Sequence, residues 1–122
     1  MTALITRDEL KTAIEAGTVT VVDALGGDHH AQQHLPGAIP LVEGEVAARA
    51  AELLPDKDAA IVTYCSNVSC GNSEAVARRL AALGYTGIRK YREGIQDWVE
   101  AGLPVETGVT VSQDTVFSQD TV

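Results

Sequence analysis

The sequence is poor in aromatic residues, in cysteine and in positive charge. Aromatic side chains make up 4% of the 122 residues, and the chain has two cysteines. Nine Lys and Arg are set against 17 Asp and Glu, which gives a formal net charge of −8. A field of this sign repels nucleic-acid phosphates and anionic lipids. We therefore expect neither nucleic acid nor a membrane among the partners.

Long apolar runs are also missing, and we do not expect the start of the chain to be a secretory leader. No apolar run reaches the ~18 residues that span a bilayer, and no basic stretch followed by an apolar one opens the chain. Cys65 and Cys70 lie five positions apart in one segment, so they cannot close the long loops that staple small secreted proteins. We expect a soluble, cytoplasmic protein.

Length and hydropathy indicate one globular domain followed by a tail. A hydrophobic fraction of 45% with 21% charged residues is typical of a chain that folds around a single core. We assign residues 1–106 to the domain and residues 107–122 to a C-terminal tail in which the sequence SQDTV occurs twice. Two copies do not make a repeat fold. The tail either has no structural role or docks on a protein partner, as an added strand or a captured C-terminus.

Helical and strand patterns alternate along the domain. Helices are predicted from the Thr6-x-x-Glu9 capping box to Gly17, and over residues 43–54, 73–83 and 94–101; strands are predicted over 18–23, 59–64 and 88–91, with a brief one near residue 39. A polar stretch at residues 26–30 can hold a further short helix. This alternation predicts an α/β fold with a mainly parallel sheet. Ligand sites in such sheets lie beyond the carboxyl ends of the strands, where Asp23 and Cys65 fall.

Cys65 stands between a buried strand and a polar loop that leads into a helix. Loop N–H groups and a helix N-terminus converge at such a place and bind anions. Lowering a thiol pKa by ~2 units requires ~2.7 kcal/mol. A helix end supplies roughly 0.3–1 kcal/mol and each amide hydrogen bond to a charged acceptor roughly 1.5–3, so the loop amides must contribute most. Two interpretations stay open: Cys65 is a reactive thiolate, or it is an inert, half-buried thiol. The candidate binding loop comprises Ser66, Asn67, Val68, Ser69, Cys70, Gly71, Asn72 and Ser73.

Several segments together resemble a single-domain rhodanese over roughly residues 4 to 106. They are Asp23 after TVV, HLPGAI from His34, IVTYC ending at Cys65, LGY from Leu83 and GIQDWVEAGLPV from Gly94. The resemblance implies a rhodanese-like fold, with a central parallel sheet flanked by helices on both faces. It also implies sulfurtransfer: the Cys65 thiolate takes a sulfane sulfur from a small donor such as thiosulfate or from a protein persulfide, and passes it to a thiol acceptor. No cofactor is expected.

The loop departs from the usual rhodanese pattern. An arginine stands five positions after the family's cysteine, with a serine next, whereas here Cys70 holds that place and Ser73 comes two residues late. Leu25 also replaces an arginine found in many members. We therefore expect thiosulfate to bind more weakly than a neutral or protein-borne persulfide. Phosphatase-like relatives need a loop arginine to hold the phosphoryl group, so phosphatase and arsenate reductase activities are not expected.

The Cys65-x4-Cys70 spacing resembles a rhodanese subgroup with a paired-cysteine loop. Two roles for Cys70 stay open. The resemblance implies that Cys70 resolves a Cys65 persulfide or sulfenic acid as an intraloop disulfide; alternatively, Cys70 only fills a small apolar niche. The pair can close only if the Cα atoms lie within about 7 Å. Two functions therefore stay open: a sulfurtransferase, or a non-catalytic rhodanese-fold module that binds a partner or senses redox state through the two cysteines.

The remaining polar candidates are given supporting roles. Asp23 either anchors neighbouring loop amides or interacts with the thiol; a carboxylate beside Cys65 would raise the thiol pKa, so we favour the anchor. His29, His30 and His34 do not follow the cysteines at zinc-finger spacing, so no metal is expected. We assign His34 a structural hydrogen-bonding role and Trp98 a place in the core.

Overall fold

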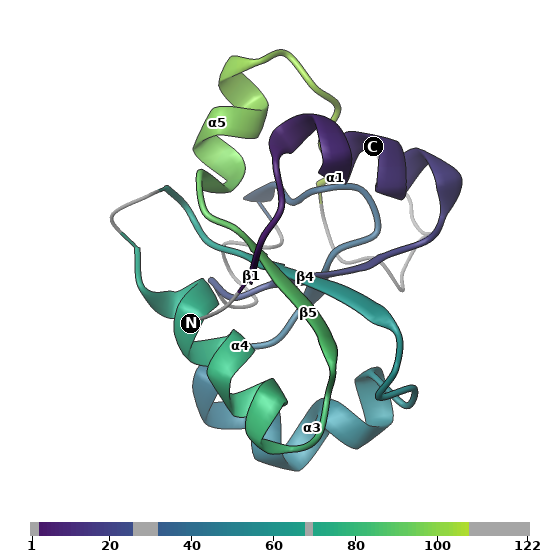
Figure 1. Cartoon of the computed structure of the whole chain (residues 1–122). Helices are drawn as coiled ribbons and strands as arrows, with labels where there is room; N and C mark the ends of the chain where they lie inside the picture. The colour runs from purple at the N-terminus through teal and green to yellow at the C-terminus, as the bar shows by residue number, and fades with distance from the viewer. Residues whose placement is uncertain (1–2, 26–31, 68–69, 108–122) are drawn as a thin grey trace, which may run out of the picture.

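A parallel sheet between two helical layers forms the described part of the chain. The computed structural model describes residues 3–25, 32–67 and 70–107 (Figure 1). Its elements are β1 (Ala3–Leu4), α1 (Arg7–Ala16), β2 (Thr20–Asp23), β3 (Ile39–Pro40), the 3-10 turn η1 (Glu43–Glu45), α3 (Val46–Leu53), β4 (Ala60–Tyr64), α4 (Asn72–Ala82), β5 (Gly87–Tyr91) and α5 (Gly94–Glu100). Within these residues, five parallel strands pair in the order β1-β5-β4-β2-β3. The predicted α/β fold is confirmed.

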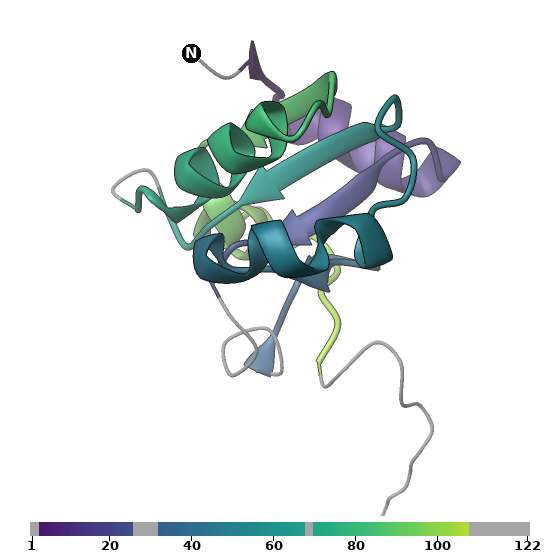
Figure 2. The ribbon, with the colours of Figure 1, turned by 90° about the horizontal axis from the view of Figure 1, so that it is seen from below.

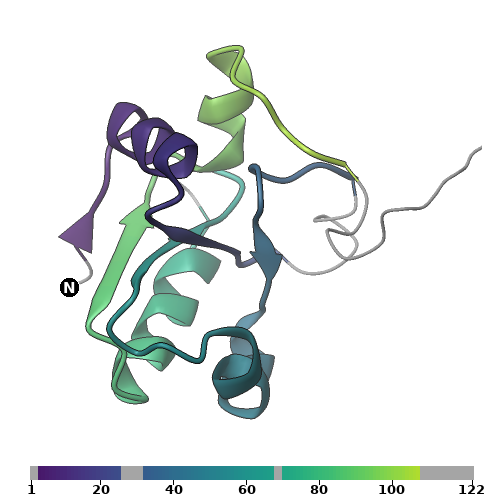
Figure 3. The same cartoon turned by 90° about the vertical axis from the view of Figure 1, so that its right-hand side faces the viewer.

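The strands bury side chains on both faces of the sheet. Val21, Val62 and Tyr64 pack with Leu10 of α1 and Trp98 of α5, whereas Val22 and Ile61 pack with Val46 of α3 and Leu80 of α4. Successive strand residues point to opposite faces, so this split places α1 and α5 on one side of the sheet and α3 and α4 on the other. Figure 3 shows the strands between these two layers. The predicted core position of Trp98, which is 1% exposed, is confirmed.

The first helix has the predicted ends. The Thr6 hydroxyl accepts a hydrogen bond from the Glu9 N–H, and the Glu9 carboxylate accepts one from the Thr6 N–H. These bonds to Thr6 hold the pKa of Glu9 below its ordinary value. Gly17 closes the helix with a φ of +70°, a conformation that glycine adopts at low cost.

Several boundaries differ from the prediction. Residues 43–54 do not form one continuous α-helix: the segment opens with η1, whose tighter i→i+3 bonds include Glu45 N–H to the Val42 carbonyl, and no side chain caps it. Strand β2 begins at Thr20 rather than residue 18, because the N–H and hydroxyl of Thr18 bond back to the Ala13 carbonyl. Helix α4 begins at Asn72, one residue early.

Strand β1 has no counterpart in the prediction. Its two residues, Ala3 and Leu4, pair with Arg89 and Lys90 of β5, and two residues are too few to show a period. The possible short helix at 26–30 and the SQDTV repeats of the tail lie outside the described residues. Among the helices that the structure describes, none has the length and apolarity needed to cross a bilayer.

Candidate functional site

The candidate site lies at the carboxyl ends of two neighbouring strands. β2 ends at Asp23 and β4 ends at Tyr64, and these two residues are paired across the sheet. In Figure 2 both strands point toward the side where the loop before α4 begins. Cys65 directly follows β4, so the structure places Asp23 and Cys65 at the sheet edge where the sequence predicts them.

A disulfide joins Cys65 to Cys70 across the loop. Their Cα atoms are 6.1 Å apart, inside the limit of about 7 Å for such a bond. The Cys65 side chain is 1% exposed, whereas Cys70 is half-buried. The structure therefore holds the loop in its oxidised form, and thiol chemistry at Cys65 requires that the disulfide first be reduced.

The start of α5 holds the start of the loop. The N–H groups of Ile95 and Gln96 donate to the carbonyls of Cys65 and Ser66, both at 2.9 Å. The peptide bonds are trans, so the N–H of Ser66 and of Asn67 points opposite to these carbonyls, away from α5. Two of the amides expected to face a sulfur anion are thereby oriented by a helix remote in sequence.

Gly94 makes this close approach possible, a role that its place in the sequence did not indicate. Its φ is +77°, and a Cβ at this position would lie 2.6 Å from the carbonyl oxygen of Cys65 and from the carbonyl group of Ser66. Only glycine fits both the conformation and the space. The sequence signal was weak, because a glycine at the start of a helix is equally explained as part of an ordinary helix end.

Side-chain and backbone bonds hold the rest of the loop. The Asn67 side-chain amide donates to Gln96 Oε1 at 3.2 Å, and that of Asn72 donates to the Ala24 carbonyl at 3.3 Å. The Thr63 hydroxyl donates to the carbonyl of buried Ser73 at 3.0 Å. The Cys70 N–H donates to the Asn67 carbonyl at 3.1 Å, so this amide, expected to face an anion, is used inside the loop. Gly71 is exposed, and Val68 and Ser69 lie outside the described residues.

Asp23 is a buried acceptor that ties together three segments of the site. Its side chain is fully buried; Oδ1 accepts from the Leu25 N–H and Oδ2 from the Tyr64 hydroxyl, each at 2.8 Å. The Tyr64 oxygen in turn accepts from the Leu35 N–H at 3.2 Å. This is the geometry of an anchor for backbone amides: it fixes the ends of β2 and β4 relative to each other and to the turn at Leu35.

Burial raises the pKa of Tyr64 far above its ordinary value, and the charge of Asp23 raises it further. Above about pH 10 the unfolded tyrosine ionises while the folded one does not. The unfolded state then binds fewer protons, so stability is lost as the pH rises. We expect the free energy of unfolding to fall by up to about 1.4 kcal/mol more per pH unit in the wild type than in Tyr64→Phe. Urea unfolding between pH 9 and 11 measures this, and equal slopes for both proteins would contradict it.

A C-terminal segment closes over the turn at His34. The backbone of His34 exchanges two hydrogen bonds with Glu106, both at 2.8 Å, and the Glu106 carboxylate accepts from the Gly37 N–H at 2.9 Å. The same carboxylate lies 3.4 Å from Nε2 of the buried His34 side chain. The Trp98 indole N–H donates to the Pro104 carbonyl at 2.7 Å. His34 thus has the structural role expected of it; His29 and His30 lie outside the described residues.

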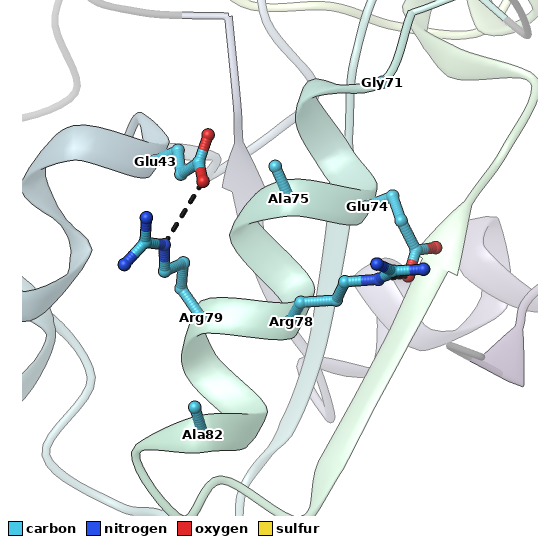
Figure 4. Close-up of a pocket in the computed structure, with 7 residues that line it drawn as sticks. All are labelled: Glu43, Gly71, Glu74, Ala75, Arg78, Arg79 and Ala82. Atoms are coloured by element: carbon cyan, nitrogen blue, oxygen red, sulfur yellow. Dashed lines mark hydrogen bonds and ion pairs between the residues drawn. The ribbon is translucent and has the colours of Figure 1, made fainter.

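A groove of about 490 Å³ borders the C-terminal end of the loop, between η1 and α4 (Figure 4). Its lining residues are Glu43, Gly71, Glu74, Ala75, Arg78, Arg79 and Ala82. Arg79 pairs with Glu43 across it at 3.2 Å, and Arg78 pairs with Glu74 at 2.9 Å. Lys90 also contacts Glu74, at 3.0 Å. Because carboxylates offset these cations, the groove does not replace the loop arginine of the usual rhodanese pattern.

Comparisons with known proteins agree with this architecture. The model of the rhodanese-like domain family matches residues 6–101. The HTH-type transcriptional regulator Rv0324 of Mycobacterium tuberculosis is 39% identical over 107 residues, which are 88% of this chain and 46% of the regulator. This chain therefore spans about half the length of that relative.

Solved structures show the same fold. The BH2092 protein of Bacillus halodurans superposes with a TM-score of 0.79 at 24% identity, over 87% of this chain and 77% of that one. The human single-domain sulfurtransferase TSTD1 superposes with a TM-score of 0.68 at 23% identity, over 82% of this chain and 97% of that one. The sequence segments, the strand order and the match over residues 6–101 lead to one conclusion: this chain belongs to the rhodanese-like domain family.

Proposed function

We propose that this protein is a sulfurtransferase in which reduced Cys65 carries the sulfur as a persulfide. The thiolate attacks the sulfane sulfur of thiosulfate or of a persulfide, and a thiol acceptor then removes it. The observation that carries the proposal is the placement of Cys65 directly after β4, with the carbonyls of Cys65 and Ser66 bound by α5 and the next two amides turned the opposite way. The family membership and the name of the human structural neighbour support it.

The uncharged loop favours some donors over others. No Lys or Arg lies between Cys65 and Arg78, so amides and the start of α4 are left to bind a donor. For a dianion such as thiosulfate, the cost in free energy of removing its hydration exceeds what hydrogen bonds from an uncharged loop can regain. This cost is smaller for a neutral or protein-borne persulfide. We therefore propose a persulfide as the better substrate. Reduction of the Cys65–Cys70 bond is a precondition, which suits a cytoplasmic location.

The direct test is the intact mass of the reduced, desalted protein after brief exposure to thiosulfate or polysulfide. We expect the Cys70→Ser variant to gain the mass of one sulfur and the Cys65→Ser variant to gain none, because only Cys65 is the proposed carrier. The two variants are matched, since each removes one thiol of the same loop. An adduct on Cys65→Ser, or none on Cys70→Ser with any donor, would contradict the proposal.

The disulfide also supports a second candidate function, a non-catalytic redox-sensing module. The two cysteines are bonded in the structure, and the related regulator from Mycobacterium tuberculosis is named as a transcriptional regulator. A sensor of this kind would lose two protons under mild oxidant and regain them with a thiol, yet form no persulfide from any donor. The mass experiment separates the two functions.

A further inference from the structure

We infer that Cys70 resolves the Cys65 persulfide within the loop and releases hydrosulfide, so that the domain also reduces sulfane sulfur to sulfide. The inference rests on the proposed function, because it begins from the Cys65 persulfide. What it adds is a second fate for that persulfide, set by the protein's own second thiol and not by an external acceptor.

The fold holds the two cysteines where this step can occur. Their Cα atoms are 6.1 Å apart and their sulfurs are bonded. Cys65 is fixed by the bond from Ile95 N–H to its carbonyl. On the other side of Cys70, Asn72 is fixed through its side-chain bond to the Ala24 carbonyl. Attack of Cys70 on Cys65 therefore leads to a loop conformation that β2, β4 and α5 already hold in place.

The two sulfur atoms of the persulfide differ in how accessible they are. The Cys65 side chain is 1% exposed, so an external thiol can reach the outer sulfur, which the transfer reaction removes, more easily than the inner one. Cys70 approaches from within the loop and reaches the inner sulfur. Transfer to an acceptor and resolution by Cys70 thus begin from the same intermediate but attack different atoms.

The step balances without an added oxidant. Thiosulfate and the Cys65 thiolate give the Cys65 persulfide and sulfite. The Cys70 sulfur then bonds to the Cys65 sulfur, the bond to the outer sulfur breaks, and the Cys70 proton passes to that outer sulfur, which leaves as hydrosulfide. The outer sulfur gains two electrons, and the two cysteines lose two as they form the disulfide.

Small thiols would return the loop to its starting state. Cys70 is half-buried and Cys65 is not accessible, so the first thiolate attacks the Cys70 sulfur and Cys65 departs as the thiolate. A second thiol then frees Cys70 and leaves as a thiol disulfide. Each cycle consumes two thiols for each hydrosulfide released, and the regenerated thiolate is the one that begins the next cycle.

The experiment is a single turnover without free thiol. Reduced, desalted protein receives thiosulfate, and sulfite, hydrosulfide, remaining thiols and alkylated intact mass are followed in time. We expect the wild type to release about one hydrosulfide per sulfite and to lose both thiols. Cys70→Ser and Cys70→Ala should release sulfite, keep the added sulfur and form hydrosulfide at least ten-fold more slowly. Protein oxidised beforehand should release neither product.

The outcomes separate this inference from the function on which it rests. A wild-type persulfide that persists beside a free Cys70, or equal hydrosulfide release from Cys70→Ser, would overturn the inference and leave the sulfurtransferase intact. Absence of sulfite and of any adduct, with thiosulfate and also with polysulfide followed by desalting, would overturn both.

Discussion

Replacement of Gly94 by alanine is expected to damage both stability and the sulfur chemistry. The new Cβ would meet the carbonyls of Cys65 and Ser66 at 2.6 Å, and these are backbone atoms that α5 itself holds. Overpacking of this kind costs about 1–3 kcal/mol and a non-glycine residue in the left-handed region about 1–2 more. We expect Gly94→Ala to lower the free energy of unfolding by about 2–5 kcal/mol, measured by urea unfolding.

Gly102→Ala is the matched control for this variant. Gly102 has nearly the same φ, +76°, but a Cβ there meets nothing within 4 Å. Its cost should be limited to the conformational part, about 1–2 kcal/mol. The rate of sulfite release from thiosulfate gives a second readout, which should fall in Gly94→Ala and stay unchanged in Gly102→Ala. Equal effects of the two substitutions would show that the approach of α5 to the loop has no special importance.

Asp23→Ala should be the most destabilising change among the buried polar residues of the site. It leaves the buried Tyr64 hydroxyl and the part-buried Leu25 N–H without their acceptor. An unsatisfied buried group costs about 1–3 kcal/mol and the part-buried N–H costs less, so we expect a loss of about 1–4 kcal/mol in the free energy of unfolding. Asp23→Asn, which keeps an acceptor oxygen, should recover part of this loss.

The chain offers an exposed copy of the same local motif. Asp56 Oδ1 accepts from the Asp58 N–H at 2.9 Å, two residues on, as Asp23 does from Leu25. Water replaces the lost partner at the exposed position, so Asp56→Ala should cost at most about 1 kcal/mol. If both alanine variants unfold at the same urea concentration, the buried Asp23 network does not carry the stability assigned to it.

Local signals were sufficient to predict most of the fold. Each of these signals depends only on residues close to it in the sequence. Examples that the structure has are the capping box at Thr6, the glycine at position 17 and the apolar strand before Cys65. Their alternation was enough for the parallel sheet. Strand β1 was missed because its two residues form a strand only through β5, some 85 residues along the chain.

The site was harder to predict, because its geometry depends on contacts between distant segments. The position of Cys65 followed from the strand before it, but the hold that Ile95 and Gln96 have on the loop carbonyls did not. Asp23 was recognisable as a residue at a strand tip, whereas its bond to the hydroxyl of Tyr64 requires the register of β2 against β4. The disulfide could not be predicted from the sequence either. The spacing of the two cysteines permits it, but only the path of the loop brings the two sulfurs together.

The segment that closes over His34 affects where this domain can be cut from a longer protein. The family match stops at residue 101, but Pro104 and Glu106 lie beyond that point and bond to Trp98, His34 and Gly37. A recombinant fragment that ends at residue 101 would remove the acceptor of the Trp98 indole N–H and the bonds that close the turn at His34. Expression boundaries for this domain, and for chimaeras built with it, belong after Glu106.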